Sequence, residues 1–212
     1  MKKPDPRFKR YHSPVSKRAF GPENPFLFKE SIPNSFGNAG LIYQARPFRL
    51  IKIRLPGAPE VPPYPTDDTT GDPVGLQLIQ FIQNYFKGLF PGDPMFFWDW
   101  LDFASQTRLQ IRVLQTVAAI PYGEVRSYKD VAESIGRPGS ARFIGNTMAQ
   151  NPFPVLIPCH RVIRSNGSMG GFGGGIDLKM RMLDMERFSA DGGQKAEVRG
   201  QMSEVKGSDL TG

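Results

Sequence analysis

The residues best suited to chemistry are a cysteine and a histidine that follow one another, Cys159 and His160. Cys159 is the only cysteine in the 212 residues, so the chain cannot form an internal disulfide. A thiol becomes a nucleophile as the thiolate. A nearby imidazole favours that form by accepting the proton, and arginine charges such as that of Arg161 stabilise it. The segment Pro158-Cys159-His160-Arg161-Val162 is therefore a candidate nucleophilic site.

A histidine that acts as a base needs a partner that fixes which ring nitrogen carries the proton. Because neighbouring side chains of a strand diverge, we expect His160 to reach the thiol through a water molecule. A carboxylate from a distant helix would suit the other ring nitrogen. The residues alone do not choose among three candidates: Asp177, Asp184 and Glu186.

Metals and cofactors are not expected. One cysteine and two histidines, His12 and His160, cannot build a four-ligand zinc site of the Cys/His type. The glycine-rich stretch 170–175 lacks the Gly-Lys-Ser/Thr ending of a phosphate-binding loop. No apolar run approaches the roughly 18–20 residues of a membrane span, so we expect a soluble, non-secreted protein with no membrane partner.

Positive charge is concentrated in two parts of the chain. Residues 1–30 carry a net +5 and residues 104–189 another +5, whereas residues 31–103 carry −2 and residues 190–212 carry −1. We expect 1–30 and 190–212 to be mobile tails. A basic second half beside a mildly acidic first half indicates one domain that faces a polyanion and one that supports it.

The first half predicts a small α/β domain over residues 31–103. Alternation predicts a strand from Arg49 to Leu55 with Ile51, Ile53 and Leu55 on one side. Helical spacing predicts a helix over 74–87 that ends at Gly88, and residues 91–100 are expected to form a loop or short strand. We assign the aromatic cluster there to the core or to a domain contact: Phe96, Phe97, Trp98 and Trp100.

The second half, from Ala104, predicts a helix-turn-helix arrangement. A buried stripe predicts a helix that ends before Pro121, and Ser127 with Asp130 predicts a capping box for the next helix. After the Gly136–Gly139 turn, a further helix is expected from Ser140 to about Gln150.

The cysteine is expected at the end of a short buried strand, Val155 to Ile157, with Arg161 to Arg164 as its continuation. A turn at 165–167 and the glycine-rich loop would follow. The last helix is expected to bury a face containing Ile176, Met180 and Leu183.

These residues resemble a known family. Pro158-Cys159-His160-Arg161-Val162 is similar to the active-site motif of the methylated-DNA–protein-cysteine methyltransferases, also called O6-alkylguanine-DNA alkyltransferases. The resemblance extends from about Thr107 to Glu186. It includes Pro121-Tyr122-Gly123-Glu124-Val125, Ser127-Tyr128, Ala141-Arg142, Asn151-Pro152 and Ser165-Asn166-Gly167.

The resemblance implies a fold and a reaction. The fold would be α+β, a ribonuclease-H-like α/β domain followed by a mostly helical, winged helix-turn-helix-like alkyltransferase domain. The reaction would be DNA repair by irreversible, single-turnover transfer of the alkyl group of O6-alkylguanine, and of O4-alkylthymine, to the cysteine. The partner would be double-stranded DNA bound by a monomer. The location would be cytoplasmic, at the nucleoid in a bacterium or in the nucleus in a eukaryote.

The resemblance also implies roles for individual residues. Cys159 would accept the alkyl group, His160 would activate it through water, Glu186 would orient the ring and Asn151 would support the turn. The residues expected at DNA are Tyr128, Arg142, Ala141, Gly145 and Arg161. The residues expected around the base are Met148, Met169, Gly170, Gly171, Phe172 and Gly173.

In detail, Arg142 would fill the stack vacated by a flipped base, and Tyr128 would push that base out. The small residues of the second helix would permit minor-groove docking. Two positions depart from the family pattern: Phe172 stands where tyrosine is usual, and Asn146 stands where glycine is common.

Three other functions are compatible with parts of the pattern. A lesion-binding protein without transfer would lack the cysteine. A winged-helix transcription factor would carry base-reading side chains where this chain has Ala141, Gly145 and Ala149. A cysteine hydrolase would need a carbonyl for water to attack.

Overall fold

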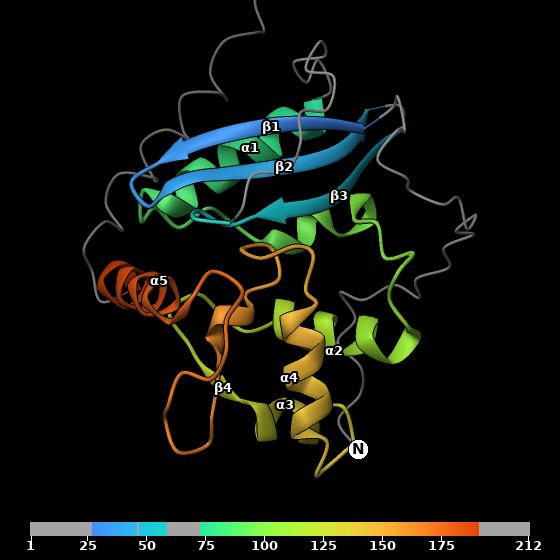
Figure 1. Cartoon of the computed structure of the whole chain (residues 1–212), viewed down its shortest axis with the longest axis vertical. Coiled ribbons are helices and arrows are strands. Elements are labelled where there is room, and N and C mark those ends of the chain that lie inside the picture. The colour runs from blue at the N-terminus through green and yellow to red at the C-terminus, as the bar shows by residue number, and fades with distance from the viewer. Residues whose placement is uncertain (1–26, 46, 59–72, 191–212) are drawn as a thin grey trace, which may run out of the picture.

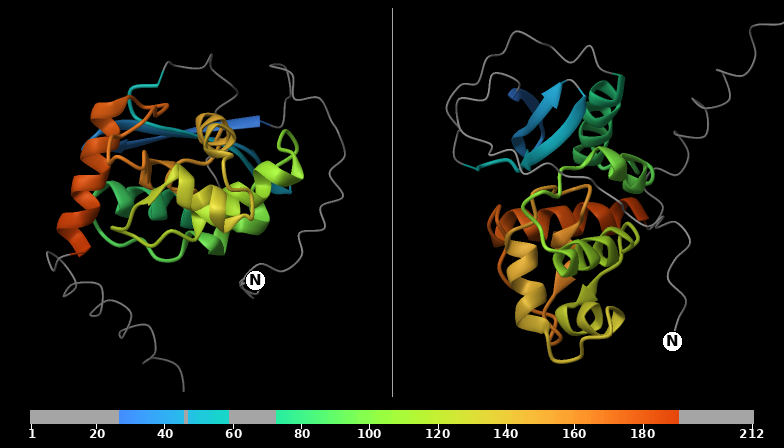
Figure 2. Two further views of the ribbon diagram at one scale, coloured as in Figure 1. Left: turned by 90° about the horizontal axis from the view of Figure 1, so that it is seen from below. Right: turned by 90° about the vertical axis from the view of Figure 1, so that its right-hand side faces the viewer.

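The computed structural model describes residues 27–45, 47–58 and 73–190 (Figure 1). We call residues 27–103 the N-terminal unit and residues 104–190 the C-terminal unit. The first is a three-stranded sheet covered by a helix, and the second is mostly helical (Figure 2). One continuous set of buried apolar side chains runs through both units. The expected α+β fold is therefore present.

The sheet of the N-terminal unit is antiparallel, in the order β1 (Leu27–Asn34), β2 (Gly37–Ala45) and β3 (Phe48–Arg54). The predicted strand at 49–55 is confirmed, but its expected buried face is partly wrong. Ile51 is the extra residue of a β-bulge opposite Ile42 and Tyr43 and is only partly buried, so Leu50 takes its place on the buried face, while Ile53 and Leu55 are buried as expected.

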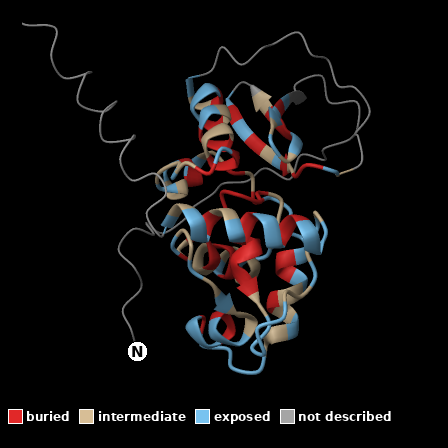
Figure 3. Cartoon of the chain, turned by 90° about the vertical axis from the view of Figure 1, so that its left-hand side faces the viewer, coloured by how far each residue is buried: buried red, intermediate tan, exposed pale blue. Residues whose placement is uncertain are grey.

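Helix α1 (Pro73–Phe86) packs against this sheet. Its buried residues include Leu78, Ile82, Tyr85 and Phe86. Figure 3 colours the ribbon by burial and shows buried segments in both units. Gly88 follows the helix with φ of +74°, a conformation in which glycine carries no steric penalty. The predicted helix and its end are confirmed.

The aromatic stretch forms the 3₁₀ helix η1 (Pro94–Trp100), so the expected loop or short strand is wrong. Asp93 caps the backbone N–H of Met95, and proline at the first position favours a helical start. Phe97 and Trp98 are buried as expected, but Phe96 is 56% exposed.

The helices of the C-terminal unit agree with the prediction. They are α2 (Arg108–Ala118), α3 (Tyr128–Ser134) and α4 (Ala141–Ala149), and the two-residue strand β4 (Arg126–Ser127) precedes α3. The capping box of Ser127 and Asp130 is present, and Thr107 with Gln110 forms a second one. Helices α3 and α4 pack against each other and against α2, which is the helix-turn-helix arrangement.

The expected strand at Val155–Ile157 is wrong. The chain turns tightly there, with Val155 at φ of +76°, and then forms the 3₁₀ helix η2 (Cys159–Arg161). A strand begins only at β5 (Val162–Ile163), which pairs parallel with β4. Residues 155–157 are apolar because they are buried, and no sheet partner lies beside them.

Helix α5 (Ile176–Phe188) is present, but two residues of its expected inner face are wrong. Ile176 is 53% and Met180 is 44% exposed, whereas Leu183 is buried. The buried face is rotated because it carries two charged side chains, Lys179 and Glu186. An apolar periodicity does not detect a face of that composition.

The expected tails lie mostly outside the described residues, at 1–26 and 191–212. The boundary at residue 30 is wrong, because β1 already begins at Leu27. No helix within the described ranges is long and apolar enough to cross a membrane.

The two units are joined by a backbone hydrogen bond and by aromatic packing. Ile53 N–H donates to the carbonyl of Pro152 at 2.8 Å. Phe103 packs on Trp98, with ring centroids 4.7 Å apart, and on Phe153, at 5.4 Å. Phe103 therefore links η1 to the turn that precedes the cysteine.

We predict that Phe103→Ala lowers the free energy of unfolding by about 3–5 kcal/mol, because it leaves a cavity between the units. Urea denaturation measures this. The matched control is Phe96→Ala, whose exposed ring should cost under about 1 kcal/mol. Equal losses for the two variants would contradict the linking role of Phe103.

Candidate active site

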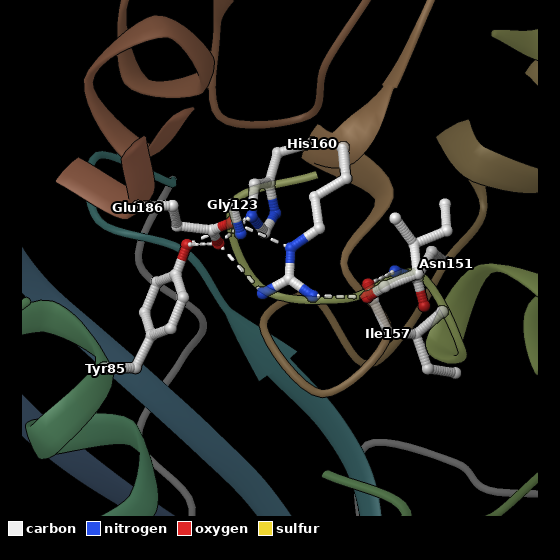
Figure 4. A network of polar contacts seen from close by, with 8 residues as sticks. Tyr85, Gly123, Asn151, Ile157, His160 and Glu186 are labelled. Carbon is white, nitrogen blue, oxygen red and sulfur yellow. Dashed lines mark hydrogen bonds and ion pairs between the residues drawn. The ribbon is translucent and has the colours of Figure 1, made fainter. Parts of the chain in front are cut away.

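A buried carboxylate stands at the centre of the site (Figure 4). Glu186 of α5 is fully buried, and both of its oxygens accept hydrogen bonds. Oε1 lies 2.7 Å from Nε2 of His160 and accepts from the Tyr85 hydroxyl at 2.8 Å. Oε2 accepts from the backbone N–H of Gly123 at 3.1 Å. Arg161 donates to both oxygens, from Nε to Oε2 at 2.8 Å and from Nη2 to Oε1 at 3.0 Å.

The structure thus places Glu186, and neither Asp177 nor Asp184, beside His160; the other two carboxylates are exposed. Burial alone would raise the pKa of Glu186. The hydrogen bonds and charges of His160 and Arg161 outweigh burial and hold the pKa at about 2. Glu186 is therefore a carboxylate throughout the neutral range.

The ring of His160 is fully buried, and burial lowers its pKa below the usual value while the Glu186 contact raises it. Its Nδ1 makes no hydrogen bond to any described residue. The neutral imidazole is favoured at neutral pH. One ring nitrogen is therefore tied to the carboxylate and the other is free to bind a proton.

Cys159 begins η2 and is 6% exposed. Burial raises the pKa of its thiol, while a hydrogen bond from Asn151 and the charge of Lys179 lower it. Lys179 is itself buried, and its Nζ donates to the carbonyl of Val162 at 2.7 Å and to that of Met169. Burial lowers the pKa of Lys179 to about 8. Burial prevails, so the pKa of Cys159 is raised and the resting group is the protonated thiol, while the cation and the amide favour the anion when the proton leaves.

Asn151 braces the turn between α4 and the cysteine. Its Nδ2 donates to the carbonyl of Ile157 at 2.8 Å, and its Oδ1 accepts from the N–H of Phe153 at 3.0 Å. The amide therefore bridges backbone groups on both sides of the turn, which is the contact expected from its chemistry. The bridge spans Val155, whose φ of +76° is unusual for a residue other than glycine.

The expected pocket residues lie on α4 and on the glycine-rich loop. A side chain at Gly170 would come within 2.9 Å of the Tyr128 hydroxyl, so the ring of Tyr128 lies over that loop. The ring centroid of Phe172 lies 6.4 Å from that of His160. Met148 of α4 is buried. Met169 is partly buried, whereas Gly171 and Gly173 are exposed on the same loop.

Helix α4 presents small residues and one arginine to solvent. Arg142 is exposed, and Ala141 and Gly145 are partly exposed. Asn146 is also exposed on this helix. No described side chain forms a hydrogen bond or an ion pair with Arg142.

The expectation for Arg161 is wrong. Its side chain is 7% exposed, and its guanidinium is used inside the protein, by Glu186 and by the carbonyl of Ile120 at 2.7 Å. Its charge compensates the buried carboxylate, so it is not presented to a phosphate.

Sequence reasoning missed two residues of the site, Tyr85 and Lys179. Tyr85 lies 101 residues before Glu186, and its helical spacing indicates only a core position. Lys179 falls on a face that the apolar pattern does not reveal. The described residues contain no cluster of three or more His, Cys, Asp or Glu that could hold a metal.

Residues 108–188 match the family model described as 6-O-methylguanine DNA methyltransferase, DNA binding domain. A methylated-DNA–protein-cysteine methyltransferase of Methanothermobacter thermautotrophicus is 49% identical over 92 residues, 43% of this chain. The chain spans about half the length of that relative, 51%.

Two further relatives extend the similarity into the N-terminal unit. The crystal structure of Mycobacterium tuberculosis OGT in complex with DNA superimposes with a TM-score of 0.62 and 29% identity, covering 76% of this chain and 94% of that one. The inducible methyltransferase of Bacillus subtilis is 32% identical over 140 residues, 66% of this chain and 71% of that protein. The chain belongs to the methylated-DNA–protein-cysteine methyltransferase family.

Proposed function

We propose that this protein repairs DNA by transferring the alkyl group of O6-alkylguanine, and of O4-alkylthymine, irreversibly to Cys159. The observation that carries the proposal is a cysteine beside a buried histidine whose far nitrogen is bound to a carboxylate. In that arrangement the histidine can accept the thiol proton during the reaction, so no metal is needed to form the thiolate. The family membership supports the same reaction.

The reaction is a single displacement. The thiol proton passes through a water molecule to Nδ1 of His160, and the thiolate sulfur attacks the alkyl carbon in line with the bond to O6. The carbon–sulfur bond forms as the carbon–oxygen bond breaks. The electron pair stays on guanine, which takes up a proton. Glu186 stabilises the imidazolium that forms.

The product is a thioether, which offers no carbonyl for water to attack. The sulfur therefore stays alkylated, and each protein molecule reacts once. The proposed active form is a monomer.

The alkyl group can be reached only if the nucleotide leaves the stack. Arg142, which is exposed on α4, would fill the gap, and Tyr128, whose ring lies over the glycine-rich loop, would push the base. The small residues Ala141 and Gly145 permit close approach to a minor groove. The base would enter beside Met148 and Phe172, against backbone groups of the glycine-rich loop.

Two other functions are less well supported. A lesion-binding protein without transfer has no use for a cysteine whose anion is favoured by a hydrogen bond from Asn151 and by the charge of Lys179. A transcription factor that reads the major groove needs several side chains that contact base edges, and α4 exposes only Arg142 and Asn146 of that kind, beside the small residues Ala141, Gly145 and Ala149.

We predict that mixing the full chain with duplex DNA containing O6-methylguanine adds one methyl group to the Cys159 peptide, at one equivalent per protein. Peptide mass spectrometry measures this. Cys159→Ser should show no transfer while binding the same DNA with unchanged affinity, because the thiol is not needed for docking. Turnover beyond one equivalent, or transfer to another residue, would overturn the proposal.

We predict that Arg142→Ala slows repair of duplex DNA about tenfold or more and slows reaction with free O6-benzylguanine much less, because only the duplex needs a wedge. Single-turnover rates on the two substrates measure this. The control is Arg187→Ala, an exposed arginine of α5. If Arg142→Ala slowed both reactions equally, Arg142 would not be the side chain that fills the gap left by the flipped nucleotide.

A further inference from the structure

A tyrosine of the N-terminal unit reaches into the centre of the site. Tyr85, on the last turn of α1, is 1% exposed and makes two contacts with its hydroxyl. The oxygen lies 2.8 Å from Oε1 of Glu186 and 3.0 Å from Nε2 of His160 (Figure 4). The three groups form a closed triangle, since Nε2 and Oε1 are 2.7 Å apart.

Proton counting gives each group one role in this triangle. Glu186 is ionised and only accepts, so the single hydroxyl proton of Tyr85 points to Oε1. The tyrosine oxygen then faces Nε2 of His160 with a lone pair. Nε2 is therefore surrounded by two acceptor oxygens and must carry the ring proton. In the neutral ring Nδ1 has no proton and can act as the base.

We propose that Tyr85 is a positioning residue for alkyl transfer: its hydroxyl donates to the carboxylate oxygen that holds His160 in the tautomer whose bare Nδ1 serves Cys159, and so tunes how strongly that carboxylate acts on the ring. The proposal rests on the proposed function for its reaction, but the tautomer does not depend on DNA. The N-terminal unit would then take part in the chemistry. Tyr85 of α1 completes a triangle whose other two members, Glu186 and His160, belong to α5 and η2.

The hydroxyl can be separated from the ring. The ring packs edge-on against Phe86 at 5.2 Å, Tyr122 at 6.3 Å and His160 at 5.9 Å between centroids. Tyr85→Phe keeps that packing and removes only the contacts of the hydroxyl, with Glu186 and with His160. Burial and the Glu186 charge raise the pKa of Tyr85 well above its usual value, so the donor persists wherever the thiol titrates.

The sign of the pH effect follows from the groups around His160. These are Glu186 and Lys179 of α5, Arg161 and Cys159 of η2, and Tyr85 of α1. Without the hydroxyl, Oε1 of Glu186 loses one donor and its charge acts more strongly on the imidazole. The imidazolium is stabilised, so the pKa of His160 rises. The acidic limb of the rate–pH profile then moves to higher pH.

The experiment compares wild type, Tyr85→Phe and Tyr122→Phe in the full chain. Tyr122→Phe is the matched control, because it removes a neighbouring hydroxyl that is bonded to neither Glu186 nor His160. Single-turnover methyl transfer from duplex O6-methylguanine and alkylation of Cys159 by iodoacetamide are each followed against pH. Thermal denaturation reports folding.

Tyr85→Phe should slow transfer about tenfold at neutral pH. It should also move the acidic limb of both profiles up by at least about half a pH unit. Tyr122→Phe should leave both limbs in place. Unmoved limbs in a folded Tyr85→Phe protein would overturn the positioning role, even if the rate fell. No transfer by wild type would defeat the proposed function instead, and the iodoacetamide profiles would still decide the role of Tyr85.

Discussion

The buried carboxylate of Glu186 is the interaction on which the rest of the site depends. An ionised group with no solvent exposure is stable only if protein donors replace its water shell. Four donor groups do so here, from Tyr85, Gly123, His160 and Arg161. They come from α1, from the turn after α2 and from η2, so satisfying one charge fixes three separate segments around α5. Removing one partner of such a pair costs about 3–5 kcal/mol.

This constraint explains why the nucleophile sits in a turn. A strand at 155–157 would carry successive side chains to opposite faces. The 3₁₀ helix η2 instead lets His160 and Arg161 both reach Glu186 while Cys159 lies near Asn151. The turn that this requires forces Val155 to a positive φ, and the Asn151 amide stabilises it. The same turn follows α4 directly, so the helix proposed to enter DNA and the nucleophile share one braced connection.

Elements that are set by local sequence could be predicted, whereas polar contacts between residues far apart in the chain could not. Helices α1 to α4 follow from apolar spacing and from caps such as Ser127 with Asp130, and the Cys159–His160 pair stands out by its chemistry. The inner face of α5 was predicted wrongly because its buried positions include charged residues. Arg161 was predicted to contact DNA because the sequence does not distinguish an arginine on the surface from one that is paired with a buried carboxylate. Tyr85 carries no local sign of its partner 101 residues away.

The protonation of His160 tests this account most directly. The chain has only two histidines, so the ¹⁵N resonances of His160 can be assigned by comparing wild type with His12→Gln. At neutral pH the account predicts a neutral ring with the proton on Nε2 and a bare Nδ1, persisting below the pH at which an ordinary histidine is protonated. A proton on Nδ1, or an imidazolium at neutral pH, would contradict it.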